Sequence, residues 1–300
     1  MEEVAVIGMG PSGISAAIYL VRYGIVPTCF ESNSIGGKLN SIGEIENYPS
    51  FVGEGKDLAK KMLEQVEHFN IKIVNKRVNK VSKNYDNGNY FVETDTDKYE
   101  FKAVIIATGI REKPFEVKGA KEINYKGISR CATCDGMFYR GKDVALLGSS
   151  LLAYEDALFL ARLVNKVYLI DPNEKSNVKE ELLNEVKSKP NIEIINGSNI
   201  VKVEGENSLE RVVIDGKENR TLDVKGLFVL IGNLPTTEFL DYMDVLNSAY
   251  FVKTDESMAT KEKGLFACGD IRSTLLRQVA TAVSDGAIAA LSVKNYLKAK

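Results

Sequence analysis

The sequence has no tryptophan, one histidine and only four cysteines among its 300 residues. It also lacks any apolar stretch near the roughly 18 to 20 residues that span a bilayer, so no membrane helix is expected. The first eight residues lack the basic start and long apolar run of a signal peptide. A net charge of -2 offers no general attraction to nucleic acid or to anionic lipid. We therefore expect a cytoplasmic protein with neither nucleic-acid nor membrane partners.

The scarcity of cysteine and histidine also argues against a structural metal. Cys29 and Cys268 lie in short apolar runs, where a lone cysteine is usually a small buried hydrophobe. A structural zinc site takes four ligands, usually two cysteine pairs or added histidines. Only one CxxC pair is present, and His68 lies in a helix rich in lysine and glutamate. We expect no metal, because a lone CxxC in a reducing compartment favours redox chemistry.

That pair is Cys131 and Cys134, followed at once by Asp135. Thiol–disulfide exchange needs an attacking thiolate, a second thiol close by and a proton donor for the leaving sulfur. The segment supplies all three. We predict a redox-active disulfide beside a bound redox cofactor, with Cys131, Cys134 and Asp135 as catalytic residues.

The segment at the N-terminus reads as a dinucleotide-binding unit. The apolar strand Val4–Ile7 runs into Gly8-Met9-Gly10-Pro11-Ser12-Gly13, and a helix with apolar residues at helical spacing follows. The first glycine permits a tight turn, the second lets a pyrophosphate approach the backbone, and the third lets helix and strand pack closely. Glu31 follows the next strand, Pro27–Phe30, where an acid binds ribose hydroxyls.

A second unit after the CATC segment repeats this order. It has a strand over Lys142–Leu147, a helix from Leu151 to about Asn165 and a strand over Val167–Ile170. With 300 residues, about two domains are expected. The predicted fold class is α/β, with two nucleotide-binding, Rossmann-like three-layer domains, the second inserted into the first.

The second turn departs from the dinucleotide pattern. Its middle glycine is replaced by Ser150, and Leu151 and Leu152 would bring apolar side chains to the phosphate site. Asp171 ends the next strand, and Pro172 and Asn173 follow, with no arginine for a 2′-phosphate. Asp171 leaves NADH open as a ligand, whereas NADPH is disfavoured.

The whole chain resembles the low-molecular-weight thioredoxin reductases. The resemblance is carried by GMGPSG at 8–13, Glu31, Gly36-Gly37, ENYP at 46–49, ATG at 107–109, CATCDG at 131–136, GLFACGD at 264–270 and Arg277-Gln278. It implies an FAD-binding domain of residues 1–112 and 241–300, an inserted disulfide domain of residues 113–240, and a homodimer whose domains swing during turnover. The cofactor contacts that it implies are Gly8, Gly10, Pro11, Ser12, Gly13, Glu31, Gly36, Gly37, Lys38, Leu39, Asn47, Ala107, Thr108, Gly109, Gly269, Asp270, Arg277, Gln278 and Val279.

The altered second turn resembles that of the ferredoxin-dependent flavin thioredoxin reductases, which keep FAD and the CxxC pair but have lost the pyridine-nucleotide site. This resemblance implies electron flow from reduced ferredoxin through FAD and the Cys131–Cys134 disulfide to thioredoxin. It also implies that Cys134 lies next to the flavin, that Cys131 faces thioredoxin, and that Asp135 is the general acid or base. An acidic ferredoxin would need a basic surface, for which the candidates are Lys113, Lys118, Lys121, Lys126, Arg130, Arg140 and Lys142.

Three alternatives stay open. One is a thioredoxin reductase that uses NADH or NADPH, which bleaching of the flavin by a pyridine nucleotide would reveal. Another is a thioredoxin-reductase-like ferredoxin–NADP reductase, a group that does not need the CATC dithiol. The third is a non-catalytic flavin-binding protein with a regulatory thiol pair, in which replacing Cys134 by serine leaves flavin turnover unaltered.

Overall fold

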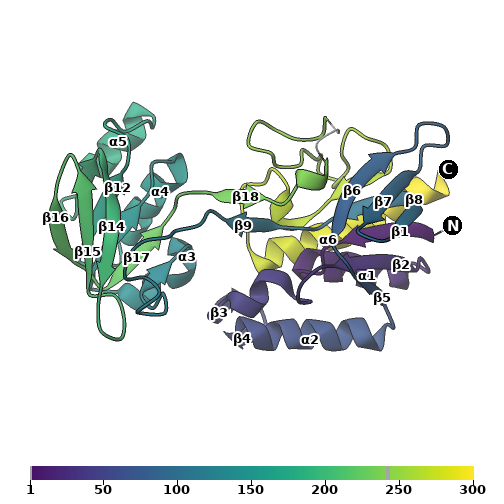
Figure 1. The fold of residues 1–300 in the computed structure, drawn as a ribbon, viewed down its shortest axis with the longest axis horizontal. Coiled ribbons are helices and arrows are strands. Elements are labelled where there is room, and N and C mark those ends of the chain that lie inside the picture. The colour runs from purple at the N-terminus through teal and green to yellow at the C-terminus, as the bar shows by residue number, and fades with distance from the viewer. Residues whose placement is uncertain (1, 241–243) are drawn as a thin grey trace. The chain divides into compact units, whose positions relative to one another are not determined.

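The computed structural model describes residues 2–240 and 244–300. The chain divides into two compact units (Figure 1). One comprises the chain up to Arg111 and again from Asn233 onward, and the other is Glu112–Gly232. The sequence-based boundaries were 112/113 and 240/241, and the assignment of FAD to the discontinuous domain stays a prediction.

The first unit is built around a sheet in the order β5-β2-β1-β8-β7-β6, with β19 also paired to β8. The members β5, β2, β1, β8 and β19 run parallel, and β7 and β6 are antiparallel. Their bounds are β1 Glu2–Ile7, β2 Pro27–Glu31, β5 Lys72–Asn75, β6 Val78–Lys83, β7 Tyr90–Thr94, β8 Lys98–Ile106 and β19 Leu265–Ala267.

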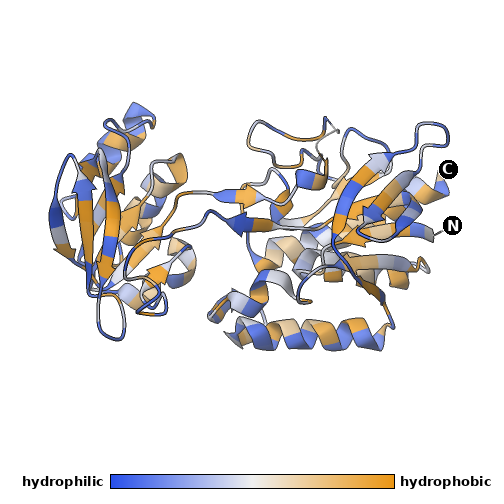
Figure 2. Cartoon of the chain, in the orientation of Figure 1, coloured by the Kyte–Doolittle hydropathy of each residue, from blue (hydrophilic) through white to orange (hydrophobic). Residues whose placement is uncertain are grey.

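Helices α1 (Pro11–Arg22), α2 (Gly55–His68) and α6 (Val279–Lys298) complete this unit. Helix α1 packs closely on α6, where a Cβ at Gly286 would lie 2.1 Å from the Ser12 carbonyl oxygen. Both faces of β1 are buried, since Val4 and Val6 enter one apolar cluster while Ala5 and Ile7 enter another. Such two-sided burial explains why the paired segments Val4–Ile7 and Ala103–Ile106 are uniformly apolar (hydropathy colours in Figure 2).

The second unit contains an all-parallel sheet in the order β10-β17-β11-β12-β13 and a separate antiparallel sheet β14-β15-β16. Its helices are the short α3, then α4 and α5. The bounds are β10 Ile128–Ser129, α3 Ala132–Asp135, β11 Asp143–Leu147, α4 Leu151–Leu160, β12 Lys166–Asp171, α5 Glu180–Lys187, β13 Ile192–Asn196, β14 Ser198–Glu204, β15 Arg211–Gly216, β16 Arg220–Asp223 and β17 Gly226–Val229.

The predicted fold class is confirmed: mixed α/β with parallel sheets in two units. Strand β8 includes both Tyr99–Phe101 and the apolar run Ala103–Ile106, because Lys102 between them does not interrupt the ladder with β1 and β7. One element prediction was wrong in its extent. The helix expected to reach Asn165 ends at Leu160.

The remaining elements are short. The hairpin β3–β4 and strand β16 were not expected from the sequence. The pair β9–β18 lies where the chain passes between the two units. The bounds are β3 Glu44–Tyr48, β4 Phe51–Glu54, β9 Ile110–Glu112, β18 Asn233–Pro235 and the 3₁₀ turns Gly37–Ser41, Gly136–Tyr139, Glu238–Leu240 and Gly269–Ile271.

Candidate functional site

The first glycine turn joins β1 to α1 and is open to a ligand. Gly8 has φ of +96°, and a Cβ there would lie 2.5 Å from the Ala107 carbonyl oxygen. At Gly13 a Cβ would lie 1.9 Å from the Gly8 carbonyl oxygen. At Gly10 a Cβ would meet nothing within 4 Å, and no side chain caps the helix. The turn therefore leaves backbone N–H groups and the positive end of the α1 dipole available to phosphate.

Glu31 lies at the end of β2, close to this turn. One carboxylate oxygen accepts from the Met9 amide at 2.8 Å, and the other accepts from the Ser32 and Asn33 amides at 2.8 Å each. The side chain is only partly buried. These bonds fix the carboxylate, and a carboxylate has enough lone pairs to accept ribose hydroxyls as well.

Other predicted cofactor residues come together around the same turn. A Cβ on Gly37 would lie 3.3 Å from the Gly10 Cα, so the double-glycine loop lies against one side of the turn. A Cβ on Gly269 would lie 2.5 Å from Ser12 Oγ, which places the chain after β19 at the start of α1. The Asn47 side-chain amide donates to Gln278 Oε1 at 3.1 Å.

The other predicted cofactor residues lie at the ends of the strands and helices around this turn or in the loop before β3. Pro11 is the first residue of α1, Ala107 to Gly109 follow β8, and Val279 begins α6. The side chain of Leu39 is buried in the apolar core, and Lys38 beside it is exposed.

Asp270 is the acid that follows β19. Burial raises its pKa, and the positive charges of Arg277 and Lys38 oppose that rise. Arg277 holds the backbone of this segment, because Nε donates to the Asp270 carbonyl at 3.2 Å and a terminal nitrogen donates to the Arg272 carbonyl at 3.1 Å. Burial in turn lowers the pKa of Arg277.

Two residues of α6 support this segment and were missed by the sequence reasoning. Asp285 accepts from the Gly269 amide at 3.1 Å and pairs with the Arg272 guanidinium at 2.7 Å. Gly286 permits the close packing of α6 on α1. The available signal was a glycine inside an alanine-rich helical pattern, which usually marks close packing.

The predicted disulfide is present in the second unit. Cys131 and Cys134 are bonded, with a Cα–Cα distance of 5.3 Å. Cys131 caps α3, since its Sγ accepts from the Cys134 amide at 3.2 Å. Cys131 is half-buried and Cys134 is exposed. Which of them faces thioredoxin stays a prediction.

Asp135 ends α3 and points to a partner that was not predicted. The Ser129 hydroxyl donates to Asp135 Oδ2 at 2.6 Å. The same hydroxyl oxygen accepts from the Cys131 amide at 3.1 Å. Asp135 is thus held by the strand that leads into the CATC segment.

The second glycine turn, between β11 and α4, differs from the first. Ser150 caps α4, its Oγ accepting from the Ala153 amide at 3.3 Å. Leu151 and Leu152, the first two residues of the helix, are 53% and 57% exposed. One N–H group at the start of α4 is therefore satisfied by a side chain, and the first two residues of the helix carry exposed apolar side chains.

The acid after the second turn differs even more. Asp171 has 0% exposure, accepts from the Tyr154 hydroxyl at 2.7 Å and accepts from the Asn173 amide at 2.9 Å. The Tyr154 hydroxyl also lies 2.6 Å from Ser176 Oγ. The sequence left Asp171 available as a ligand for the ribose of NADH. In the structure its carboxylate is buried and hydrogen-bonded to the Tyr154 hydroxyl.

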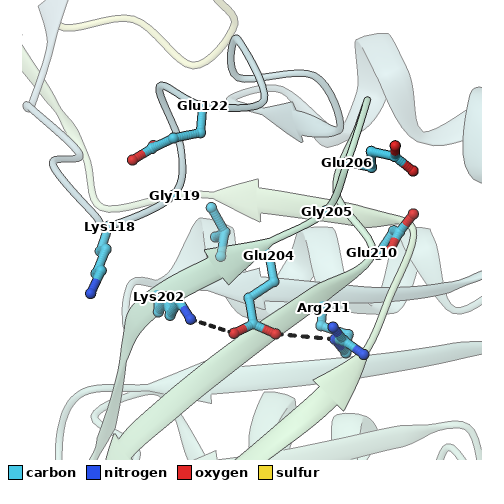
Figure 3. A pocket seen from close by; sticks show the side chains of 10 residues that line it. Lys118, Gly119, Glu122, Lys202, Glu204, Gly205, Glu206, Glu210 and Arg211 are labelled. Atoms are coloured by element: carbon cyan, nitrogen blue, oxygen red, sulfur yellow. Dashed lines mark hydrogen bonds and ion pairs between the residues drawn. The ribbon is translucent and has the colours of Figure 1, made fainter.

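Two of the basic residues predicted for a ferredoxin surface, Lys118 and Arg130, have acidic neighbours. Lys118 lines an open surface pocket together with Lys202 and Arg211 (Figure 3). Four glutamates line the same pocket, and Glu204 pairs with both Lys202 and Arg211. Arg130 pairs with Glu112 at 3.7 Å. The pocket therefore has mixed charge. Its glutamates would oppose the binding of an acidic ferredoxin near Lys118.

Comparison with known proteins places this site in a family. The family model for pyridine nucleotide-disulphide oxidoreductases matches residues 2–286. The chain is 38% identical to a thioredoxin reductase of Helicobacter pylori, with 99% of each chain covered. The structure of a thioredoxin reductase from Streptococcus pyogenes superposes with a TM-score of 0.92 at 32% identity, covering 99% of this chain and 98% of that one. A ferredoxin-flavin thioredoxin reductase from Clostridium acetobutylicum gives a TM-score of 0.55 at 28% identity, covering 99% and 98%.

The chain belongs to the pyridine nucleotide-disulphide oxidoreductase family. Its relatives within that family include many thioredoxin reductases, and FAD is the cofactor of this group. The first turn fits this cofactor, because the space over Gly10 is open and the end of α1 is uncapped. No helix in the described part of the chain is long and apolar enough to cross a membrane.

Proposed function

We propose that this chain is a thioredoxin reductase that draws electrons from reduced ferredoxin rather than from a pyridine nucleotide. The observation that carries the choice of donor is the second turn, where Ser150 caps α4 and Tyr154 seals Asp171. To bind here, a nucleotide would have to displace the Ser150 cap and bring its phosphates close to the exposed side chains of Leu151 and Leu152. To reach Asp171, its ribose would have to break the buried hydrogen bond from Tyr154. Each of these steps lowers its affinity.

The first unit is the proposed FAD site. Gly8, Gly10 and Gly13 shape the turn, Glu31 is placed for ribose hydroxyls, and Asp270 follows Gly269, which lies against Ser12. Bound FAD supplies a redox centre that accepts single electrons and delivers a pair to a disulfide. Proposed contacts also include Gly36, Gly37, Asn47, Thr108, Arg277 and Gln278.

The second unit is the proposed dithiol site. In the reduced pair, one thiolate attacks the thioredoxin disulfide, its S–S bond breaks, and a mixed disulfide forms. The second thiol then attacks the mixed disulfide, which restores the Cys131–Cys134 bond and releases thioredoxin as a dithiol. Two electrons and two protons pass to thioredoxin in total, and Asp135 takes and returns a proton during the exchange.

The direction of electron flow is favourable. Plant-type ferredoxins have potentials near roughly −400 mV, and thioredoxin lies near about −270 mV. The two-electron drop corresponds to about 6 kcal/mol. Ferredoxin is therefore a competent donor for this dithiol.

The test is an anaerobic titration of the purified flavoprotein, followed by its visible flavin absorbance. Reduced ferredoxin should bleach the flavin, and excess oxidised thioredoxin should restore it, whereas NADH and NADPH should leave it oxidised. Rapid bleaching by either nucleotide would contradict the ferredoxin proposal and favour the NADH- or NADPH-dependent alternative.

A cysteine variant separates catalysis from a merely regulatory thiol pair. In Cys134→Ser, ferredoxin should still bleach the flavin, but thioredoxin should no longer restore its colour. Restoration at the wild-type rate would favour the non-catalytic reading. The homodimeric state and the cytoplasmic location stay predictions.

A further inference from the structure

Asp135 makes a hydrogen bond that none of the sequence motifs explains. Its partner, Ser129, lies on β10, which is paired in parallel with β17 through Ser129 and Phe228. Ser129 is buried, whereas Asp135 is partly accessible. A buried hydroxyl on a paired strand is a fixed donor, because the sheet holds its backbone and packing limits its rotation.

The direction of the bonds is set by the atoms present. The Cys131 amide can only donate, so Ser129 Oγ accepts from it at 3.1 Å. The single hydroxyl proton is then directed to Asp135 Oδ2, only 2.6 Å away, rather than to the Cys131 carbonyl at 3.3 Å. The result is a chain of two bonds from the attacking segment to the carboxylate.

We propose that Ser129 is a positioning residue for disulfide exchange, which fixes the Asp135 carboxylate through the chain of bonds that also holds the Cys131 amide. This inference rests on the dithiol chemistry proposed above. Ser129 touches neither sulfur in that chemistry and acts through Asp135. During exchange the carboxylate takes the proton of the attacking thiol and returns a proton to the leaving thiolate, so its own proton balance is zero.

The bond has a definite consequence for the rate of exchange. Without the Ser129 hydroxyl, the Asp135 carboxylate loses the donor that fixes its position. In Ser129→Ala, the second-order rate of exchange should therefore fall by about tenfold, as expected for the loss of a bond to a charged group.

The experiment uses the full chain, reduced chemically, freed of reductant and mixed with 2-hydroxyethyl disulfide at pH 7.5. This small disulfide has a basic leaving thiolate and reacts whether or not thioredoxin is the natural partner. Ser129→Ala should lower the second-order rate about tenfold, and Ser129→Thr, which keeps the hydroxyl, should restore it. Asp135→Asn should lower the rate at least as much, and adding Ser129→Ala to it should change nothing further.

The matched control is Ser188→Ala, which removes an exposed hydroxyl bonded only to the Glu185 carbonyl. An unchanged rate in Ser129→Ala, or a further fall when Ser129→Ala is added to Asp135→Asn, would overturn the proposal. A parallel series with oxidised thioredoxin separates the two claims. Failure of wild-type protein to reduce thioredoxin would contradict the proposed function, while the small-disulfide series still decides the role of Ser129.

Discussion

The two glycine turns of this chain join a strand to a helix in the same order, but they differ in capping and in the burial of the acid that follows. Counting from Gly8 and Gly148, Gly10 corresponds to Ser150 and Glu31 corresponds to Asp171. The first turn is uncapped and its acid is partly accessible, whereas the second is capped by a side chain and its acid is fully buried. The same local fold therefore either presents or withdraws a binding site, according to a few side chains.

The decisive side chain lies one residue beyond the turn. Ile14 follows the third glycine, in α1. Its buried side chain has no polar atom, so it cannot hydrogen-bond to Glu31. Tyr154 holds the corresponding place in α4, and its hydroxyl reaches Asp171. One hydroxyl converts an acid placed for ribose into part of a buried network.

The largest expected effect comes from Gly10→Ala, which gives the first turn a side chain. Gly10 has φ of −77° and ψ of −175°, which alanine adopts freely, and its Cβ would meet nothing. The unit should fold normally while FAD affinity falls by about 100-fold, because the methyl group keeps pyrophosphate from the backbone. Flavin content and fluorescence titration measure this. Normal flavin affinity in a folded variant would mean that the first turn is not the pyrophosphate site.

A second effect concerns Asp156, a nearly buried acid in α4 where α1 has Ala16. Burial, helped by the charge of Glu155, raises its pKa to about 6. Because the folded state then prefers the protonated form, wild-type stability should fall as pH rises from about 4, the unfolded value, to about 6.

Asp156→Asn should therefore be more stable than wild type by about 2 kcal/mol at pH 7.5 and no more stable at pH 4. Urea unfolding at a series of pH values measures the difference. A difference that does not change with pH would show that burial of this acid is not its cause.

Tyr154→Phe tests the hydrogen bond from Tyr154 to buried Asp171 directly. The ring should keep its packing, but the buried acid loses one donor, so we expect a loss of about 1.5 kcal/mol in the free energy of unfolding. Flavin content should not change. Tyr19→Phe serves as a control, because Tyr19 is exposed and its ring lies tilted beside that of Tyr23. Equal stability of the two variants would argue that the Tyr154 hydroxyl contributes nothing.

The smallest effect is expected for Ser150→Ala. This variant and Gly10→Ala place alanine at corresponding positions of the two turns. Loss of the cap on α4 should lower the free energy of unfolding by about 1 kcal/mol. FAD affinity should stay at the wild-type value, in contrast to Gly10→Ala. A loss of flavin from this variant would break the distinction between the two turns.

The sequence predicted the parts of this comparison that depend on local geometry. The spacing of Gly8, Gly10 and Gly13 demands a tight turn and close packing, and both are observed. The CATC pair and the burial of Cys29 and Cys268 were also predicted correctly. These features follow from backbone conformation and hydrophobicity, which residue identity and spacing report.

Long-range contacts could not be read in the same way. Whether Asp171 faces solvent depends on how far the Tyr154 side chain reaches across to β12, which no spacing rule gives. The bond from Ser129 to Asp135 joins a strand to a helix end, and Asp285 supports Gly269 from another helix. Each depends on packing of elements that must first be assembled, so only the structure revealed it.

The central claim is that the second turn of this chain does not bind a pyridine nucleotide. Calorimetric titration of NADH and NADPH into the oxidised flavoprotein tests it without any electron transfer. We predict no saturable heat for either nucleotide up to millimolar concentration, in wild type and in Ser150→Ala alike. Saturable binding of either nucleotide in the micromolar range would contradict the account.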